Sequence, residues 1–168
     1  MNQKYFYANR GMYLEELINK TIEYYSSNEI AFFEKRFLPI KILNKLDDNF
    51  IRGKLLKKSY VDYCGVYRGK YISFEAKQTN NNDFFLLSQI KEHQIKHIIK
   101  INSFGGISFV IVHFYNSSRT FLISYDVLEK WISDHKNKIS IRTFEKQTIE
   151  IEIAFPGILD FLSKLKID

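Results

Sequence analysis

The sequence predicts a mixed α/β fold in which helices flank a central sheet. Apolar residues recur at helical spacing in residues 11–27 and 86–102, while apolar runs of strand length fill 60–77 and 105–125. The chain has 168 residues, of which 45% are hydrophobic and 16% aromatic, so a substantial core can form. This length suits one domain and is short for two.

The first half of the chain predicts a helix, a break and an excursion from the core. Residues 11–27 place Leu14, Ile18 and Tyr25 on one helical face. Residues 29–37 predict a short helical turn, which Pro39 ends. Residues 40–59 begin as a strand and become charged and irregular, which is typical of an excursion.

The second half alternates strands and helices. Residues 60–77 predict a β-hairpin whose turn is Tyr67–Lys70, with Gly69 supplying backbone freedom. A polar loop precedes the helix at 86–102, and 105–115 and 119–125 predict two antiparallel strands. The remaining expectations are a helix at 126–135 with Asp126 as N-cap, extended pieces at 138–142 and 148–155, and a closing helix at 156–165.

The net charge of +6 and the pI of about 9.2 favour a polyanion as partner, which includes DNA, RNA and acidic membrane surfaces. The alternative is a solvated lysine-rich surface without a charged partner. Cys64 is the single cysteine, so the sequence excludes an internal disulfide and a cysteine-based zinc site. No stretch has the length and apolar character of a signal peptide or a membrane span, so we expect a soluble, cytoplasmic protein.

Three charged residues occupy the hairpin that otherwise predicts sheet interior. Strand alternation places Glu75 and Lys77 on one face, and a turn centred on Arg68 and Gly69 places Asp62 across from Glu75. Neighbouring carboxylates repel, and a divalent cation between them relieves the repulsion. Mg²⁺ takes one or two carboxylates together with water and phosphate oxygens, and an adjacent lysine can position water or neutralise a phosphate. These residues therefore predict a phosphodiester-cleaving site. The alternative is a solvated polar face in which Lys77 pairs with a carboxylate.

Gln94 interrupts the apolar stripe of the helix at 86–102. A buried amide needs partners, which here are either a metal site or the backbone. His93 and His97 are spaced to share a metal, but no third ligand is evident, so helix-surface histidines are the preferred interpretation. His113 lies inside an apolar strand and is expected to be a hydrogen-bonded core residue.

The chain carries five motifs in the order NRGMYLEELIN, VDYCGVYRGKYISFEAKQT, HQIKHI, GGISFVIV and SIR. Their order resembles that of the RecU-type Holliday-junction resolvases, over most of the chain from Asn9 to about Arg142. The long motif at 61–79 is the specific part of this resemblance.

The resemblance implies a restriction-endonuclease-like core of the PD-(D/E)xK nuclease superfamily, forming a single nuclease domain over residues 1–168. It implies a homodimer that binds four-way DNA junctions and nicks two strands symmetrically with Mg²⁺ or Mn²⁺. By position, Asp62 and Glu75 match the metal carboxylates, Lys77 the catalytic lysine and Gln94 the metal-site glutamine. Residues 44–58 match a stalk that enters the junction.

The chain departs from the family pattern at two places. Tyr60 stands where the family has a threonine; nothing is lost if that threonine serves through its backbone, whereas a role of its hydroxyl would imply weaker metal binding in this chain. The arm that many relatives carry before NRGM is largely missing, so contact with a recombinase is doubtful.

The expected DNA contacts are basic side chains that hold phosphates: Arg52, Lys54, Lys57, Lys58, Arg68 and Lys70. Three alternatives stay open, namely a duplex-specific nuclease of the same superfamily, a non-catalytic basic DNA-binding module and a purely structural protein.

Overall fold

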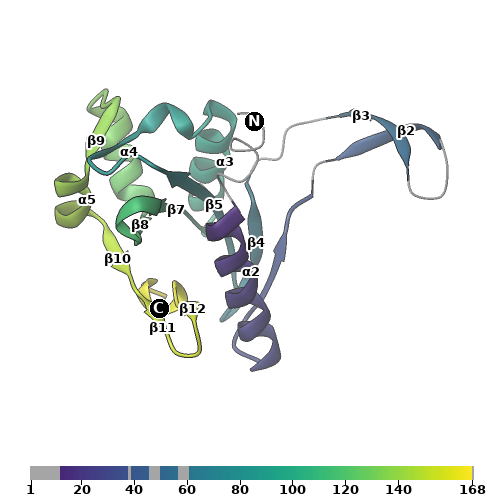
Figure 1. Ribbon diagram of the computed structural model, residues 1–168, viewed down its shortest axis with the longest axis horizontal. Coiled ribbons are helices and arrows are strands. Elements are labelled where there is room, and N and C mark those ends of the chain that lie inside the picture. Colours follow the sequence, from purple (N-terminus) through teal and green to yellow (C-terminus); the bar gives the residue numbers. More distant parts are fainter. Residues whose placement is uncertain (1–11, 38, 46–49, 57–60, 168) are drawn as a thin grey trace, which may run out of the picture.

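The computed structural model describes residues 12–37, 39–45, 50–56 and 61–167. Its centre is a six-stranded sheet with the order β1-β4-β5-β7-β8-β10 (Figure 1). The strands are β1 (Phe32–Lys35), β4 (Tyr63–Tyr67), β5 (Lys70–Thr79), β7 (Ile107–Phe114), β8 (Arg119–Ile123) and β10 (Ile149–Ile151). β5 and β7 run parallel and the other neighbours run antiparallel. The predicted mixed α/β fold with a central sheet is therefore confirmed.

Helices cover both faces of this sheet. α2 (Met12–Ser27) packs on one face with the C-terminal segment, in a core cluster that includes Ile18 and Phe74. The other face carries α3 (Glu92–Ser103), α4 (Tyr125–Ser133) and α5 (Ile141–Gln147), around a cluster that includes Trp131. Among the described residues, no helix combines the length and the apolar character needed to cross a bilayer.

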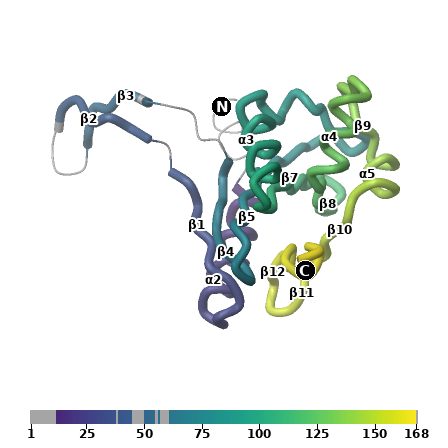
Figure 2. Tube along the Cα trace, turned by 180° about the vertical axis from the view of Figure 1, so that it is seen from behind, coloured from purple at the N-terminus to yellow at the C-terminus, as the bar shows by residue number. Residues whose placement is uncertain are grey.

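The excursion after β1 is an antiparallel hairpin of β2 (Ile40–Lys45) and β3 (Ile51–Leu55), which we call the stalk because it projects from the core (Figures 1 and 2). Gly53 permits the close approach of its strands, since an added Cβ would clash with Cγ2 of Ile40. The stalk begins at Ile40, earlier than the expected 44–58, and residues 46–49 and 57–60 lie outside the described part of the chain.

Shorter elements complete the chain. Two further small sheets are formed by β6 (Phe84–Leu86) with β9 (Lys138–Ser140) and by β11 (Ile153–Ala154) with β12 (Ile158–Leu159). The 3₁₀ turns are η1 (Leu87–Gln89), η2 (Tyr115–Ser117) and η3 (Leu162–Lys164).

Several local predictions were wrong. The extended piece expected at 138–142 ends at Ser140, where α5 begins, and that helix was not predicted. The helical turn expected at 29–37 is strand β1, because its aromatic pair extends the sheet beside β4. The closing helix expected at 156–165 is replaced by β12 and η3, because Gly157 has a φ of 95° and the next residues pair with β11. α4 begins one residue early, so Ser124 and not Asp126 is its N-cap.

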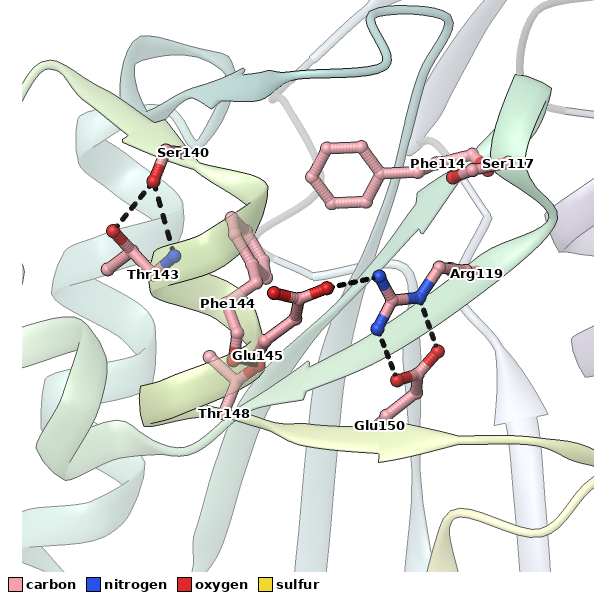
Figure 3. Close-up of polar contacts among 9 residues, drawn as sticks. All are labelled: Phe114, Ser117, Arg119, Ser140, Thr143, Phe144, Glu145, Thr148 and Glu150. Atoms are coloured by element: carbon pink, nitrogen blue, oxygen red, sulfur yellow. Dashed lines mark hydrogen bonds and ion pairs between the residues drawn. The ribbon is translucent and has the colours of Figure 1, made fainter.

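An ion-pair cluster of Arg119, Glu145 and Glu150, which we call the Arg119 clamp, joins β8, α5 and β10 (Figure 3). Arg119 donates to both oxygens of Glu150 at 2.7 and 2.6 Å and to Glu145 at 2.6 Å. The clamp therefore fixes the far edge of the sheet.

Ser140 caps α5 by accepting the backbone N–H of Thr143 at 3.2 Å.

Candidate active site

The hairpin of β4 and β5 sets the relative positions of the charged residues. Arg68 and Gly69 both have positive φ, at 49° and 73°, as a two-residue hairpin turn requires. Tyr63 pairs with Phe74, so the same register carried one residue further places Asp62 opposite Glu75, as predicted. Asp62 is held there because its Oδ2 accepts the backbone N–H of Ala76 at 3.0 Å.

Glu75 is buried on the face of the sheet that α3 covers. It pairs along the sheet with Val110, which belongs to the core beneath α3 and α4, and Glu75 is only 1% exposed. A carboxylate in such a place is not part of a solvated polar face. That alternative is therefore wrong for Glu75, although Lys77 does form the ion pair that it anticipated.

The two oxygens of Glu75 have different surroundings. Oε1 accepts from the ammonium of Lys77 and from the side-chain amide of Gln94, the latter at 2.5 Å. Oε2 is buried and has no hydrogen-bond partner among the described residues. Leaving a buried carboxyl oxygen unpaired is costly, and the described residues offer this atom only the neighbouring carboxyl of Asp62, so a proton or a cation shared with Asp62 would satisfy it.

The electrostatics agree with this geometry. Burial and the negative charge of Asp62 raise the pKa of Glu75 to about 8, against the opposing effect of Lys77. Asp62 is partly exposed, and the side chain of Lys77 is 20% exposed. The cluster of Asp62, Glu75 and Lys77, which we call the hairpin cluster, therefore meets solvent on one side and the core on the other.

Gln94 is hydrogen-bonded at both ends of its amide, to the backbone, as one alternative anticipated, and to Glu75. Its Oε1 accepts the backbone N–H of Lys91 at 2.9 Å, at the start of α3. Because that N–H can only donate, the oxygen must face Lys91 and the amide nitrogen must face Glu75. In this structure Gln94 therefore orients Glu75, and binding a metal through its oxygen would require the amide to turn over.

The donor set fits a hard divalent cation. Among the described residues, no group of three or more His, Cys, Asp or Glu side chains could hold a metal ion. Mg²⁺ needs only one or two carboxylates, because it keeps water and takes phosphate oxygens. Asp62 and the unpaired Oε2 of Glu75 meet that requirement, and the oxygen donors favour Mg²⁺ or Mn²⁺ over zinc.

Comparison with known proteins identifies the family of this chain. The family model for RecU, recombination protein U, matches residues 9–167. The chain belongs to the RecU family. It is 43% identical over 162 residues to the Holliday junction resolvase RecU of Ureaplasma parvum, covering 96% of this chain and 92% of the relative. It is 39% identical to the enzyme of that name from Mycoplasmopsis pulmonis, covering 94% of each chain. The Bacillus subtilis enzyme of that name is 35% identical, over 95% of this chain and 78% of the relative.

The expected DNA contacts of this RecU-family chain fall into two groups. Arg52 and Lys54 are exposed on β3 of the stalk, and Lys57, Lys58 and Tyr60 lie outside the described residues. The stalk is rooted beside the hairpin cluster, because the N–H of Arg36 donates to the carbonyl of Asp62 at 2.7 Å. The stalk cations therefore share one end of the sheet with the site.

Arg68 and Lys70 lie at the opposite end of the hairpin. Both are exposed in the β4–β5 turn, five residues along β5 from Glu75, which is about 16 Å at strand rise. The structure therefore does not bring them beside the hairpin cluster.

Another candidate residue has a structural partner. His113 is buried and bonds Thr120 Oγ1 at 2.9 Å, which confirms it as a core residue.

Arg36 was missed by the sequence reasoning because β1 was interpreted as a helical turn. A strand interpretation of residues 32–35 would have placed Arg36 opposite Asp62.

Proposed function

We propose that the chain is a structure-selective endonuclease that resolves four-way (Holliday) DNA junctions by metal-dependent, symmetric nicking during recombination and repair. The observation that carries the proposal is the buried, unpaired Oε2 of Glu75 beside Asp62 and Lys77. Membership of the RecU family, whose relatives are named Holliday junction resolvases, supports it.

Each site residue has a distinct role in the proposed reaction. Asp62 and Glu75 would hold the divalent cation, Mg²⁺ or Mn²⁺, with Gln94 keeping the Glu75 carboxylate in place or joining as a ligand. When bound, that cation lowers the pKa of a coordinated water and offsets charge on the phosphate. Lys77, which is partly exposed, would approach the scissile phosphate, orient the attacking water and offset negative charge as the phosphorus gains a fifth oxygen. The products would be nicks with a 5′-phosphate.

The proposed substrate is branched DNA bound chiefly through phosphates. The stalk presents the exposed cations Arg52 and Lys54 from the end of the sheet that carries Asp62. A homodimer would place two sites on two symmetric strands, with residues 1–168 of each copy acting as one nuclease domain in the cytoplasm. Shape would then select the junction, because phosphate contacts carry little sequence information.

The first experiment incubates the purified chain with a labelled four-way junction and with linear duplex, in Mg²⁺, Mn²⁺ or EDTA. The proposal predicts paired symmetric nicks in the junction that EDTA abolishes. Equal cutting of duplex would identify a duplex nuclease of the same superfamily. Tight junction binding without cutting in either metal would identify a non-catalytic DNA-binding module.

A further inference from the structure

A basic groove lies beside the hairpin cluster and is assigned to none of the contacts above. It has a volume of about 720 Å³, and one wall is a partly exposed face of α3. That wall carries His93, Lys96, His97 and Lys100, at spacings of three and four residues that place them on one helical face. The facing cation is Arg36, which comes from the segment after β1.

Both walls are tied to the hairpin cluster. α3 packs against β5, and its residue Gln94, next to His93, donates to Glu75. On the other wall, the backbone N–H of Arg36 donates to the carbonyl of Asp62. The groove therefore starts beside the carboxylates and runs along α3, away from them.

The charge of the groove is strongly positive. Of the described residues that line it, none is acidic, and Lys96 is partly neutralised by Glu92 at 2.6 Å on the outer surface. Arg36 and Lys100 add to burial in lowering the pKa of His97, as expected where positive charges converge. An ordinary solvent-exposed helix face would also carry lysines. It would not have Arg36 facing it from a separate segment of the chain, which is what makes this surface a groove.

We propose that this groove binds the backbone phosphates that adjoin the scissile phosphate on the DNA strand being cut. His93 to Lys100 spans about 10 Å of helix, which is long enough to contact more than one phosphate of a DNA strand. Phe104, which is 82% exposed at the far end, offers a face on which a sugar or base can pack. This inference rests on the proposed function, since it extends the same site.

The test measures DNA binding in EDTA, so that it does not depend on cutting. Fluorescence anisotropy gives the junction Kd between about 50 and 200 mM salt for the full chain, the double variant Arg36→Gln/Lys100→Gln and the control Lys130→Gln, an exposed lysine on α4 outside the groove. The double variant is expected to bind about tenfold more weakly and to reduce the salt slope by about 2, because each phosphate contact contributes about 0.9. The control should match the wild type.

Position along the strand is tested with uncharged methylphosphonates at the phosphates next to the cleavage site. Each should weaken binding by the wild type and have little further effect on the double variant, while the conservative variant Arg36→Lys/Lys100→Arg should behave as the wild type. Unchanged salt slopes, or methylphosphonate losses that are equal in wild type and double variant, would overturn the inference. Failure of the wild type to cut junctions would instead overturn the proposed function, which the binding assay does not measure.

Discussion

The hairpin cluster and the Arg119 clamp each contain one cation and two carboxylates, yet only one of them satisfies its charges. In the clamp, Arg119 bonds both oxygens of Glu150 and one of Glu145, in a partly exposed setting. In the hairpin cluster, Lys77 pairs with one oxygen of Glu75 and leaves the other buried and without a partner among the described residues.

The carboxyl pKa values of the two clusters are shifted in opposite directions. Hydrogen bonds from Arg119 lower the pKa of Glu150, whereas burial and Asp62 raise that of Glu75 to about 8. The clamp is complete within the chain and serves structure. In the hairpin cluster the described residues leave Oε2 of Glu75 with only the carboxyl of Asp62 beside it, and a shared cation is the partner that the proposed function supplies.

The largest expected effect separates the two clusters by activity. Glu75→Ala should reduce junction cutting at least about a hundredfold, because it removes a metal carboxylate, while junction binding in EDTA stays within twofold of wild type at about 0.1 M salt. Gel assays of nicking and anisotropy measure the two quantities, with Glu150→Ala as the control that keeps cutting. Parallel loss of cutting and binding would contradict the assigned role.

A Lys77 variant tests whether the ammonium group of the hairpin cluster acts in the reaction. Lys77→Met keeps the aliphatic stem and removes the charge, and it should lower the single-turnover rate on saturating junction by about a hundredfold. Lys130→Met, on the surface of α4, should leave the rate unchanged. A Lys77→Met rate close to wild type would reduce Lys77 to a structural partner of Glu75.

A Gln94 variant tests whether this side chain holds the Glu75 carboxylate in the position that metal binding needs. Gln94→Leu removes the 2.5 Å hydrogen bond to Glu75 and should weaken Mn²⁺ binding about 10- to 100-fold, measured by calorimetry without DNA. Gln147→Leu is the control, because Gln147 accepts from Trp131 and lies away from the cluster. Equal Mn²⁺ affinity in wild type and Gln94→Leu would show that Glu75 is held by other contacts.

The smallest effect is expected in the clamp. Arg119→Ala should lower the free energy of unfolding by about 1 kcal/mol without changing the cutting rate, because partly exposed ion pairs contribute little. Glu150 has a lowered pKa, so its contribution is present at neutral pH and is lost as the pH falls through that pKa. Chemical unfolding at pH 7 and pH 3 measures this, and a loss of several kcal/mol would make the clamp a larger determinant of the fold than proposed.

The sequence predicted the hairpin cluster well because local rules determine it. The turn at Arg68 and Gly69 fixes the register, and strand alternation then places Asp62 opposite Glu75. Gln94 was detectable as the polar interruption of an apolar helical stripe. The unpaired Oε2 and the direction of the Gln94 amide were not predictable, because they depend on how α3 packs on the sheet.

The wrong elements were those in which tertiary pairing outweighs local preference. β1 is four residues long and has a sequence compatible with a helical turn, and only its pairing with β4 makes it a strand. The same error hid Arg36, and with it one wall of the basic groove.

The most direct test of the account is the pH dependence of the unfolding free energy of Glu75→Gln and wild type in EDTA. A raised carboxyl pKa destabilises the folded state as pH rises from about 4.5 towards 8, so the variant should be more stable by about 3 kcal/mol at pH 7 and equal at acid pH. Glu150→Gln should show no such gain, and Mn²⁺ should stabilise the wild type more than Glu75→Gln. A Glu75→Gln variant that is less stable than wild type across this range would mean that the carboxylate is satisfied within the chain, and would contradict the account.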